Sequence, residues 1–439
     1  MHLDREAIVR LDKQYVWHPY TAMRRYIDEV DPLVIDRAEG ARLYDVDGKS
    51  YLDGNSSWWV STLGHNHPRL VEALRRQASK LCHTSLAGVT HEPAAALAEA
   101  LVAVAPRPLS RVFYSDNGST ANEVAIKLSL QYFRNVGQPA RKRFVALEGA
   151  FHGETMGVTS LCGVEVFRRP FAGAVMECLF VPPPPAGEAH TAGHEVAFGA
   201  LAEVLEQGRG EIAAVVLEPL VQGSIGMRMY DPELLRRARA LCDAHDVLLV
   251  IDEVFTGYGR AGGMWACASA GVTPDIMTVG KGFTGGVLPM AATLTTDRIF
   301  DAFLPPENTF YYGHSFCGNP LGAAIAREVL AVFEEEQLLA QAAPKMARIA
   351  QAFSDLGQIP GVSNARALGM IGALDLRPGA GYLGDLGWRA YAEARRLGAY
   401  LRPLGDVVYI APPLTIPDDD LTELLDIVRR SVQFALGAA

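Results

Sequence analysis

The sequence has few cysteines, and their arrangement suggests neither a disulfide framework nor a zinc site. Its six cysteines are scattered along the chain, and no two of them form a C-x-x-C pair. Such spacing is typical of free thiols in a reducing compartment. Histidines are also few, at 11, and no H-E-x-x-H motif accompanies the pair in GHNHP. A metal-dependent mechanism therefore has no support.

Further absences narrow the class of protein. Acidic residues outnumber basic ones, 50 against 40, and the net charge of −10 argues against a general nucleic-acid-binding surface. Apolar runs fall short of the roughly 18 residues that a membrane span needs. The N-terminal segment MHLDREAIVRLDKQY is charged and lacks the apolar core of a secretory signal. We therefore predict a cytoplasmic protein that binds neither nucleic acid nor membrane.

What is present is a chain of 439 residues with ordinary globular composition, 49% hydrophobic and 21% charged. This length favours two or more packed units. We predict an N-terminal arm and small-domain segment over 1–75, a large domain over 76–320 and a small C-terminal domain over 321–439, because long helical patterns begin near residue 320. The Pro-rich segment 181–195 is predicted to be a surface excursion within the large domain.

The central part of the sequence alternates short apolar strands with amphipathic helices. The clearest strands are Arg111–Tyr114, Phe144–Leu147, Ala213–Leu217 and Val247–Ile251. Most are continuous apolar runs, as expected for strands that are covered on both faces. Apolar stripes at helical spacing occupy 119–134 and 231–246. This alternation predicts an α/β fold with a largely parallel sheet and helices on both sides.

An acid, an amine and a turn rich in small residues follow predicted strands. Asp252 ends the strand VLLVI, where open α/β sheets bind ligands. Lys281 lies between two glycines in TVGKGFTGG, and alone it reads as a solvated loop lysine. The turn SDNGST contains Gly118 and Ser119 at a helix N-terminus, which suits a phosphate but is equally typical of an ordinary N-cap.

Together, these groups are what pyridoxal phosphate requires of a protein: an amine, a carboxylate beside the ring nitrogen and a phosphate site. We therefore predict a pyridoxal phosphate enzyme. Lys281 is expected to bind the cofactor's aldehyde and to move protons as a general base. Asp252 is expected to keep the ring nitrogen protonated.

One motif favours a different cofactor. GYGRAG at 257–262 matches the dinucleotide-binding pattern G-x-G-x-x-G. Five residues separate it from the preceding strand, however, and the stretch after it is a poor helix. GFTGGV occupies the place of the acidic ribose partner. We therefore reject a nicotinamide-dependent dehydrogenase.

The chain resembles the class III, or ω-amino, aminotransferases of the fold-type I pyridoxal phosphate enzymes. The resemblance covers about residues 15–415 and rests on FYSDNGSTANEVAIK, GAFHGETMG, VVLEPLVQG, IDEVFTGYGRAG, VGKG and GHSFCGNPLGAA. It implies a mostly parallel seven-stranded sheet in a large domain, a smaller α/β domain, and a homodimer with active sites at the interface. Because no basic helix-turn-helix precedes the matching segments, a cofactor-binding regulator on the same fold is disfavoured.

The resemblance also implies roles for individual residues. Phe151 takes the place of an aromatic residue, often Tyr, that lies over the cofactor ring. Gly313, His314 and Ser315 would lie at the dimer interface, the last two near the phosphate of the neighbouring cofactor and Gly313 near the substrate. Glu154 stands where many members have Asp. Arg260 is expected to be a donor-side or structural ion-pair group, with Glu218 as its partner.

Three further segments, VWHPYTAM, DGNSSWWVSTLGHNHP and LRPLGDVVYIAPPL, are similar to the biotin-pathway branch of this family. The similarity implies that Trp58 and Trp59 wall the substrate slot, that Tyr20 recognises substrates, and that Arg402 holds the substrate carboxylate. From the residues alone, a core pair of tryptophans, an interface tyrosine and a surface arginine remain possible.

This branch implies transfer of an amino group to 8-amino-7-oxononanoate, which gives 7,8-diaminononanoate in biotin biosynthesis. GHS at 313–315 is similar to members that take lysine as amino donor, whereas Tyr20, Trp58 and Trp59 follow the S-adenosylmethionine type. S-adenosylmethionine is favoured and lysine stays open. The alternative is another ω-amino acid aminotransferase, of the 4-aminobutyrate, ornithine or β-alanine type.

Overall fold

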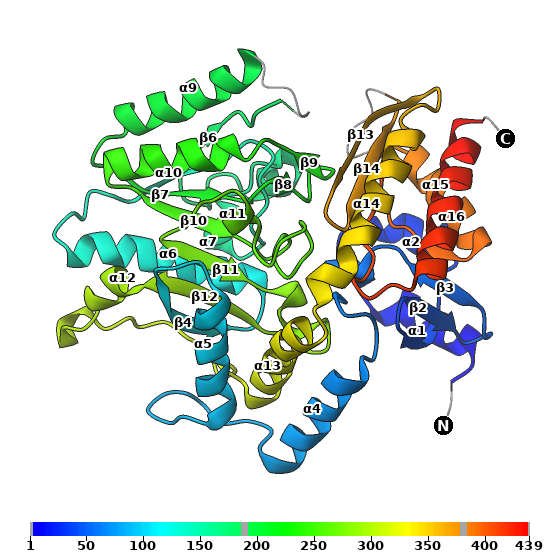
Figure 1. Ribbon diagram of the computed structural model, residues 1–439, viewed down its shortest axis with the longest axis horizontal. Coiled ribbons are helices and arrows are strands. Elements are labelled where there is room, and N and C mark those ends of the chain that lie inside the picture. Colours follow the sequence, from blue (N-terminus) through cyan, green and yellow to red (C-terminus); the bar gives the residue numbers. More distant parts are fainter. Residues whose placement is uncertain (1–2, 186–191, 378–383, 438–439) are drawn as a thin grey trace.

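The computed structural model describes residues 3–185, 192–377 and 384–437. Figure 1 shows a large unit built around a sheet and, beside it, a smaller unit that holds both ends of the described chain. The predicted surface excursion at 181–195 lies partly outside the described residues. The domain boundaries proposed from the sequence stay a prediction.

The large unit contains a seven-stranded sheet, as the family resemblance implies. Its strands, in spatial order, are β4 (Leu109–Ser115), β12 (Ala291–Thr296), β11 (Ile276–Val279), β10 (Leu248–Asp252), β7 (Ile212–Leu217), β5 (Arg143–Leu147) and β6 (Cys178–Val181). Strand β12 runs antiparallel to both of its neighbours, and the other neighbouring pairs are parallel. The prediction of a largely parallel sheet is therefore confirmed, and the four strands read from the sequence are β4, β5, β7 and β10.

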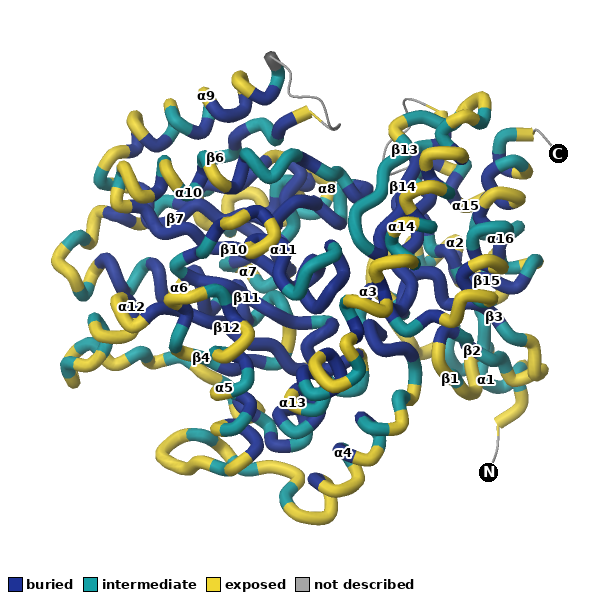
Figure 2. Tube along the Cα trace, in the orientation of Figure 1, coloured by how far each residue is buried: buried dark blue, intermediate teal, exposed yellow. Residues whose placement is uncertain are grey.

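Helices cover both faces of this sheet, which explains why its strands are continuously apolar. Successive residues of β10 enter different cores: Leu248 and Val250 pack on the side of α6 (Gly118–Asn135), and Leu249 and Ile251 pack on the side of α10 (Glu233–His245). Helices α5 (Glu92–Val104), α9 (Ala192–Gln207) and α13 (Pro320–Glu335) also contribute to the second core. The central strands β7, β10, β11 and β12 are buried along their whole length, whereas the edge strands β4 and β6 are partly accessible (Figure 2).

The smaller unit joins the beginning of the chain to its end. Strands β1 (Ile35–Glu39), β2 (Arg42–Asp45), β3 (Ser50–Asp53) and β15 (Ala399–Tyr400) form one sheet, in which β15 is parallel to β3. Strands β13 (Val362–Leu368), β14 (Ile371–Leu376) and β16 (Val407–Ile410) form an antiparallel sheet. Helix α14 (Leu338–Leu356) packs on β13 and β14, and α15 (Leu386–Leu397) packs on α16 (Asp418–Leu436).

The remaining elements are short or peripheral. They are helices α1 (Arg5–Tyr15), α2 (Met23–Glu29), α3 (Ser56–Trp59), α4 (Pro68–Lys80), α7 (Met156–Thr159), α8 (Glu165–Arg168), α11 (Ala266–Ser269) and α12 (Asp297–Asp301), strands β8 (Val221–Gln222) and β9 (Arg228–Met229), and 3-10 turns η1 (Arg169–Phe171), η2 (Lys281–Thr284) and η3 (Pro306–Asn308). All six cysteines are free thiols, as predicted.

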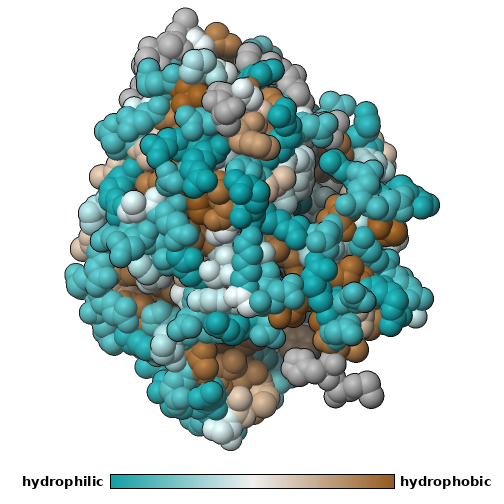
Figure 3. Space-filling model, turned by 90° about the vertical axis from the view of Figure 1, so that its right-hand side faces the viewer, coloured by the Kyte–Doolittle hydropathy of each residue, from teal (hydrophilic) through white to brown (hydrophobic). Residues whose placement is uncertain are grey.

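The surface over the smaller unit is mainly hydrophilic, with scattered hydrophobic patches (Figure 3). Within the described ranges, no helix combines the length and the apolar character that crossing a bilayer requires.

Candidate active site

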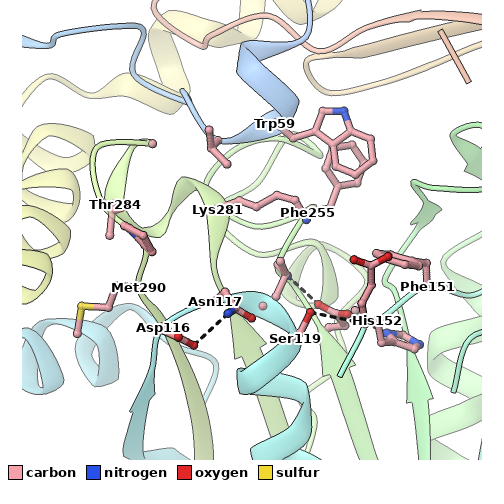
Figure 4. Close-up of a pocket in the computed structure, with 18 of the residues that line it drawn as sticks. Trp59, Asp116, Asn117, Ser119, Phe151, His152, Phe255, Lys281, Thr284 and Met290 are labelled. Atoms are coloured by element: carbon pink, nitrogen blue, oxygen red, sulfur yellow. Dashed lines mark hydrogen bonds and ion pairs between the residues drawn. The ribbon is translucent and has the colours of Figure 1, made fainter. Parts of the chain in front are cut away.

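Polar groups gather where β4, β11, β10, β7 and β5 end, at one edge of the large sheet. Parallel strands present their carboxyl ends together, so residues that are distant in sequence meet there. Asp116 follows β4, Lys281 follows β11, Asp252 ends β10, Glu218 follows β7, and Phe151 lies in the loop after β5. All of them line one cavity of about 710 Å³. Figure 4 shows this cavity with Lys281 near its centre.

Asp252 is held by donors from several elements. The pleat of β10 turns this side chain toward α6, where the Asn122 amide donates to Oδ2 at 2.9 Å. His152 Nδ1 lies 2.8 Å from the same oxygen, and Oδ1 accepts from the Val254 N–H at 3.0 Å and the Thr278 hydroxyl at 3.3 Å. Burial opposes a charge on His152, but its bond to Asp252 outweighs this and raises the pKa of the imidazole. The bond to Asp252 therefore favours the protonated form of His152.

Lys281 begins η2 with a positive φ of 46° and extends into the cavity. Its amine lies 5.2 Å from the centre of the Trp59 ring, and Figure 4 shows it pointing toward Trp59 and Phe255. Desolvation lowers the pKa of this amine, against the opposing charges of Asp252 and Glu218. Burial thus shifts Lys281 toward the uncharged form, which is the nucleophile and the proton acceptor.

The turn after β4 is a helix N-terminus with two free donors. Asn117 caps α6, since its side chain accepts the Thr120 N–H at 3.0 Å. The N–H groups of Gly118 and Ser119 have no acceptor within the described chain, and both residues line the cavity. A Cβ on Gly118 would lie 2.7 Å from Val254, so only glycine fits there. The free N–H groups and the positive end of the helix dipole at this turn fit a phosphate.

The donor set as a whole fits pyridoxal phosphate. The cavity offers a buried carboxylate that can hold a proton at a ring nitrogen, an amine that can condense with an aldehyde, and free N–H groups for a phosphate. Phe151, predicted to lie over the ring, is on the cavity wall. No set of His, Cys, Asp and Glu side chains that could hold a metal ion occurs in the part of the chain that the structure describes.

The segment with the paired tryptophans has an unusual backbone. Ser56, Ser57, Trp58 and Trp59 all have positive φ, between 45° and 76°, so the short helix α3 is left-handed. Non-glycine residues pay about 1–2 kcal/mol each for this conformation. Surrounding hydrogen bonds retain it: the Ser56 hydroxyl donates to the Ala411 carbonyl at 2.7 Å, and the Trp59 indole donates to a tyrosine hydroxyl at 3.0 Å.

This left-handed turn separates the two tryptophans. Trp59 is buried and lines the cavity of Lys281, whereas Trp58 is half exposed and lines a second cavity of about 650 Å³. Arg402 lines the second cavity too, with its guanidinium 4.7 Å from the centre of the Trp58 ring. The ring of Tyr20 lies 5.5 Å from that of Trp58, and its hydroxyl donates to Glu154 at the edge of the first cavity. Tyr20, Trp58, Trp59 and Arg402 are therefore neighbours, but Trp58 and Trp59 line different cavities.

The predicted interface residues lie apart from these groups. Gly313, His314 and Ser315 do not line the cavity of their own chain. His314 Nε2 lies 3.7 Å from Asp116 Oδ1, near the turn that contains Gly118 and Ser119. Their expected contact with a neighbouring subunit stays a prediction.

The expected ion pair between Arg260 and Glu218 was wrong. Arg260 is fully buried and donates to the Pro412 carbonyl at 2.6 Å and to the Ser56 hydroxyl at 3.3 Å. Burial lowers the pKa of Arg260 to about 10. Glu218 instead faces the cavity and accepts the N–H groups of Phe151 and Gly223. The two side chains therefore have different surroundings. Arg260 supports the left-handed turn through Ser56, whereas Glu218 lines the cavity.

Sequence reasoning missed Asn122, His152 and Thr278 as supports of Asp252. Two of them carried a signal. Asn122 is four residues after Gly118, so both lie on one face of α6. His152 directly follows Phe151 in GAFHGET. Thr278 had no such signal, because only the pairing of β10 with β11 brings it opposite Asp252.

The comparisons with known proteins agree with this geometry. Residues 25–432 match the family model "Aminotransferase class-III". The chain is 38% identical to an adenosylmethionine-8-amino-7-oxononanoate aminotransferase from Geobacter sulfurreducens, over 99% of each chain. It is 42% identical to a protein of the same name from Synechococcus elongatus, over 93% of this chain and 96% of the relative.

Two solved structures are similar over nearly the whole chain. The adenosylmethionine-8-amino-7-oxononanoate aminotransferase of Methanocaldococcus jannaschii has a TM-score of 0.92 at 33% identity, covering 98% of this chain and 99% of its own. An omega transaminase from Pseudomonas jessenii in complex with PMP has a TM-score of 0.92 at 29% identity, with the same coverage of each chain.

A substitution of Glu218 tests the electrostatics of the cavity. Burial raises the pKa of this carboxyl from its ordinary value near 4.5 to about 7. The folded protein therefore binds the proton more tightly than the unfolded chain, and this stabilisation is lost as pH rises through 7. Between pH 4.5 and 8, Glu218→Gln should gain stability relative to the unsubstituted protein by on the order of 3 kcal/mol. Urea unfolding at several pH values measures this difference.

The exposed Glu203, which accepts a hydrogen bond from its helix neighbour Gln207, supplies the control. Glu203→Gln should leave the pH profile of stability unchanged. Parallel profiles for Glu218→Gln and the unsubstituted protein would contradict the expected shift at Glu218.

Proposed function

Because the chain belongs to the class III aminotransferase family, we propose that it is a pyridoxal phosphate enzyme that transfers an amino group to 8-amino-7-oxononanoate, giving 7,8-diaminononanoate in biotin biosynthesis. We propose S-adenosylmethionine as the amino donor, in accordance with the names of the relatives. The observation that carries the proposal is the meeting of Lys281 and Asp252 in one cavity, whose Trp59 wall adjoins the cavity of Trp58 and Arg402.

The residues of the first cavity divide the chemistry among them. Pyridoxal phosphate, when bound, supplies an aldehyde that condenses with amines and a ring that accepts electrons. The free N–H groups of Gly118 and Ser119 bind its phosphate, and Phe151 covers the ring. Asp252 holds the proton at the ring nitrogen, and His152 keeps that carboxylate in place.

Lys281 performs the proton transfer. Lys281 would hold the aldehyde of the cofactor, and its desolvated amine, when free, would take the proton from the substrate's amine-bearing carbon. Amino transfer to the ketone reverses the direction, with Lys281 now returning a proton to the former carbonyl carbon. The burial that lowers its pKa makes the same amine available for both directions.

The acceptor is a long aliphatic chain that ends in a carboxylate. The rings of Trp59 and Phe255 pack at a tilt with their centres 4.4 Å apart, Trp59 lies against the amine of Lys281, and the two form an apolar wall for the reacting end. Trp58 and Tyr20 supply further aromatic surface toward Arg402, and the guanidinium of Arg402 suits a bidentate bond with the carboxylate. This arrangement supports an acceptor whose ketone and carboxylate lie far apart.

We also propose a homodimer in the cytoplasm. Large apolar side chains stay exposed in the single chain, among them Trp17 at 87%, Tyr311 at 89% and Phe316 at 59%. The last two flank Gly313, His314 and Ser315. Pairing of two chains over this loop would cover these rings and bring His314 and Ser315 to the phosphate of the neighbouring site.

Removal of the reactive amine is the first prediction from this function. Lys281→Ala should abolish the yellow absorbance of the purified enzyme and lower turnover by at least about 10³-fold. Lys345→Ala is a matched control, since that half-buried lysine donates to the Leu414 carbonyl at 3.0 Å outside the cavity. Visible spectra and a single-turnover assay give the answer. If Lys281→Ala keeps both colour and turnover, the assignment of the amine is wrong.

The carboxylate anchor gives the second prediction. Arg402→Ala should raise the KM for 8-amino-7-oxononanoate about 10- to 100-fold, as expected for the loss of a charged hydrogen bond. Arg395 lines the same cavity but binds Asp31, so Arg395→Ala should change KM little. Steady-state kinetics measures KM for both variants. A larger increase of KM in Arg395→Ala than in Arg402→Ala would show that Arg395, and not Arg402, binds the carboxylate.

A donor screen tests the function itself. S-adenosylmethionine, lysine and alanine are mixed separately with the enzyme, and pyridoxamine formation is followed by absorbance. Fast conversion by S-adenosylmethionine, followed by production of 7,8-diaminononanoate from the ketone, is expected. If only lysine converts the cofactor, the proposed donor is wrong and the proposed acceptor is unaffected. Reaction with 4-aminobutyrate, ornithine or β-alanine and no product from 8-amino-7-oxononanoate would favour the general ω-aminotransferase.

A further inference from the structure

We propose that Glu218 selects the acceptor by binding the ammonium group on the carbon next to the reacting ketone. The inference rests on the proposed function, since it names the part of 8-amino-7-oxononanoate that this side chain would recognise. Neither the motif that contains Glu218 nor the roles assigned above to Lys281, Asp252 and Arg402 account for this carboxyl.

The position of Glu218 places it beside the chemistry. It directly follows β7, the strand that pairs with β10, so it stands at the sheet edge next to Asp252. Its side chain is on the wall of the cavity that contains Lys281, and only 6% of the residue is exposed. A substrate whose ketone carbon reacts at Lys281 therefore brings its neighbouring atoms to the wall that contains Glu218.

The carboxylate is oriented but not neutralised. Oε1 accepts the Phe151 N–H at 3.1 Å, and Oε2 accepts the Gly223 N–H at 3.0 Å. These two bonds hold the group rigidly and leave each oxygen with further accepting capacity. Among the described residues, no lysine, arginine or histidine forms an ion pair with Glu218, and Arg260, its expected partner, donates elsewhere.

Other acidic groups of the cavity are already engaged. Asp252 is satisfied by four donors from the protein. Glu154 accepts the hydroxyl of Tyr20 at the edge of the cavity. Burial raises the pKa of Glu218 to about 7, although the charge of His152 and the two N–H groups act in the opposite direction. A cation that entered the cavity could form the direct ion pair that the described residues do not provide.

The chemistry of the acceptor provides such a cation. In 8-amino-7-oxononanoate the ammonium is bonded to the carbon adjacent to the ketone, so it lies one carbon from the atom that receives the new amine. A charged hydrogen bond between this ammonium and Glu218 would stabilise the correct acceptor. A ketone without the ammonium would leave the carboxylate buried and uncompensated, and sites of this kind reject such analogues strongly.

The experiment compares two acceptors, 8-amino-7-oxononanoate and 7-oxononanoate, which lacks only the 8-amino group. The unsubstituted holoenzyme should prefer the first in kcat/KM. In Glu218→Gln, this preference should fall roughly 10- to 100-fold, mainly through the KM of the amino ketone, because only that acceptor loses a charged hydrogen bond. Glu218→Asp keeps the charge but shortens the reach, so its preference should lie between those of the other two enzymes, and it decides the question if the Gln variant fails to fold.

Glu253→Gln is the matched control. Glu253 is as deeply buried as Glu218 and directly follows Asp252 in the sequence, but it does not line the cavity. Its carboxylate accepts the Thr256 hydroxyl, and it accepts the Cys267 N–H at 2.7 Å. This variant should keep the preference for the amino ketone. An equal loss with both acceptors in Glu218→Gln, with the preference retained, would overturn the proposal and assign Glu218 to the support of the site.

The two hypotheses fail in different ways. If the unsubstituted enzyme accepts neither ketone but turns over with other amino acceptors, the proposed function is wrong and the inference ends with it. If the enzyme accepts both ketones with equal kcat/KM, the function stands and the inference about Glu218 is wrong.

Discussion

The hydrogen bonds around the Asp252 carboxylate are the interaction on which the site depends. An ionised carboxylate inside a protein is strongly destabilising unless its oxygens are satisfied. Here the donors come from α6, from the loop after β5 and from β11, so the site forms only when all three have packed on β10. The pairing of Asp252 with Thr278 also requires the correct register of β10 and β11. A slip of one residue would turn Asp252 into the opposite core.

Glu218 and Asp252 show how one sheet edge can treat two carboxyls differently. Asp252 meets four donors, among them the imidazole of His152, which suits its place beside a cofactor ring. Glu218 accepts two backbone N–H groups and forms no ion pair among the described residues, and its burial raises its pKa, so the protein tolerates a local loss of stability there. Proteins retain a destabilising buried group where a bound ligand satisfies it, because the residue that is best for activity is often not the one that is best for stability.

The left-handed turn of Ser56–Trp59 has a similar cost and a clear geometric result. In a right-handed helix or a strand, the side chains of two neighbouring tryptophans would point in directions different from those seen here. In this turn one ring covers the amine of Lys281 and the other contacts Arg402. The fully buried Arg260 of GYGRAG supports the turn through Ser56 and does not pair with Glu218. Strain that is retained by surrounding bonds is characteristic of functional sites.

Local sequence determined the strands, the helices that cover them and the positions of the reactive groups. Continuous apolar runs require burial on both faces, and a polar residue at the end of such a run must lie at the sheet edge. Asp252, Lys281 and the turn at Gly118 could therefore be predicted, because each follows a strand directly or nearly so. The family resemblance added Phe151, Trp59 and the number of strands, which spacing alone does not contain.

Only the tertiary structure decided which of these groups meet. Thr278 and Asn122 support Asp252 through pairing and packing between elements distant in sequence, and Arg260 and Glu218 are separated by layers that no motif reveals. The assignment of Trp58 and Trp59 to different cavities depends on backbone angles that a sequence of ordinary L-residues does not predict. Local patterns specify which faces of an element are buried, whereas the neighbours of a buried polar group depend on the register and packing of the whole chain.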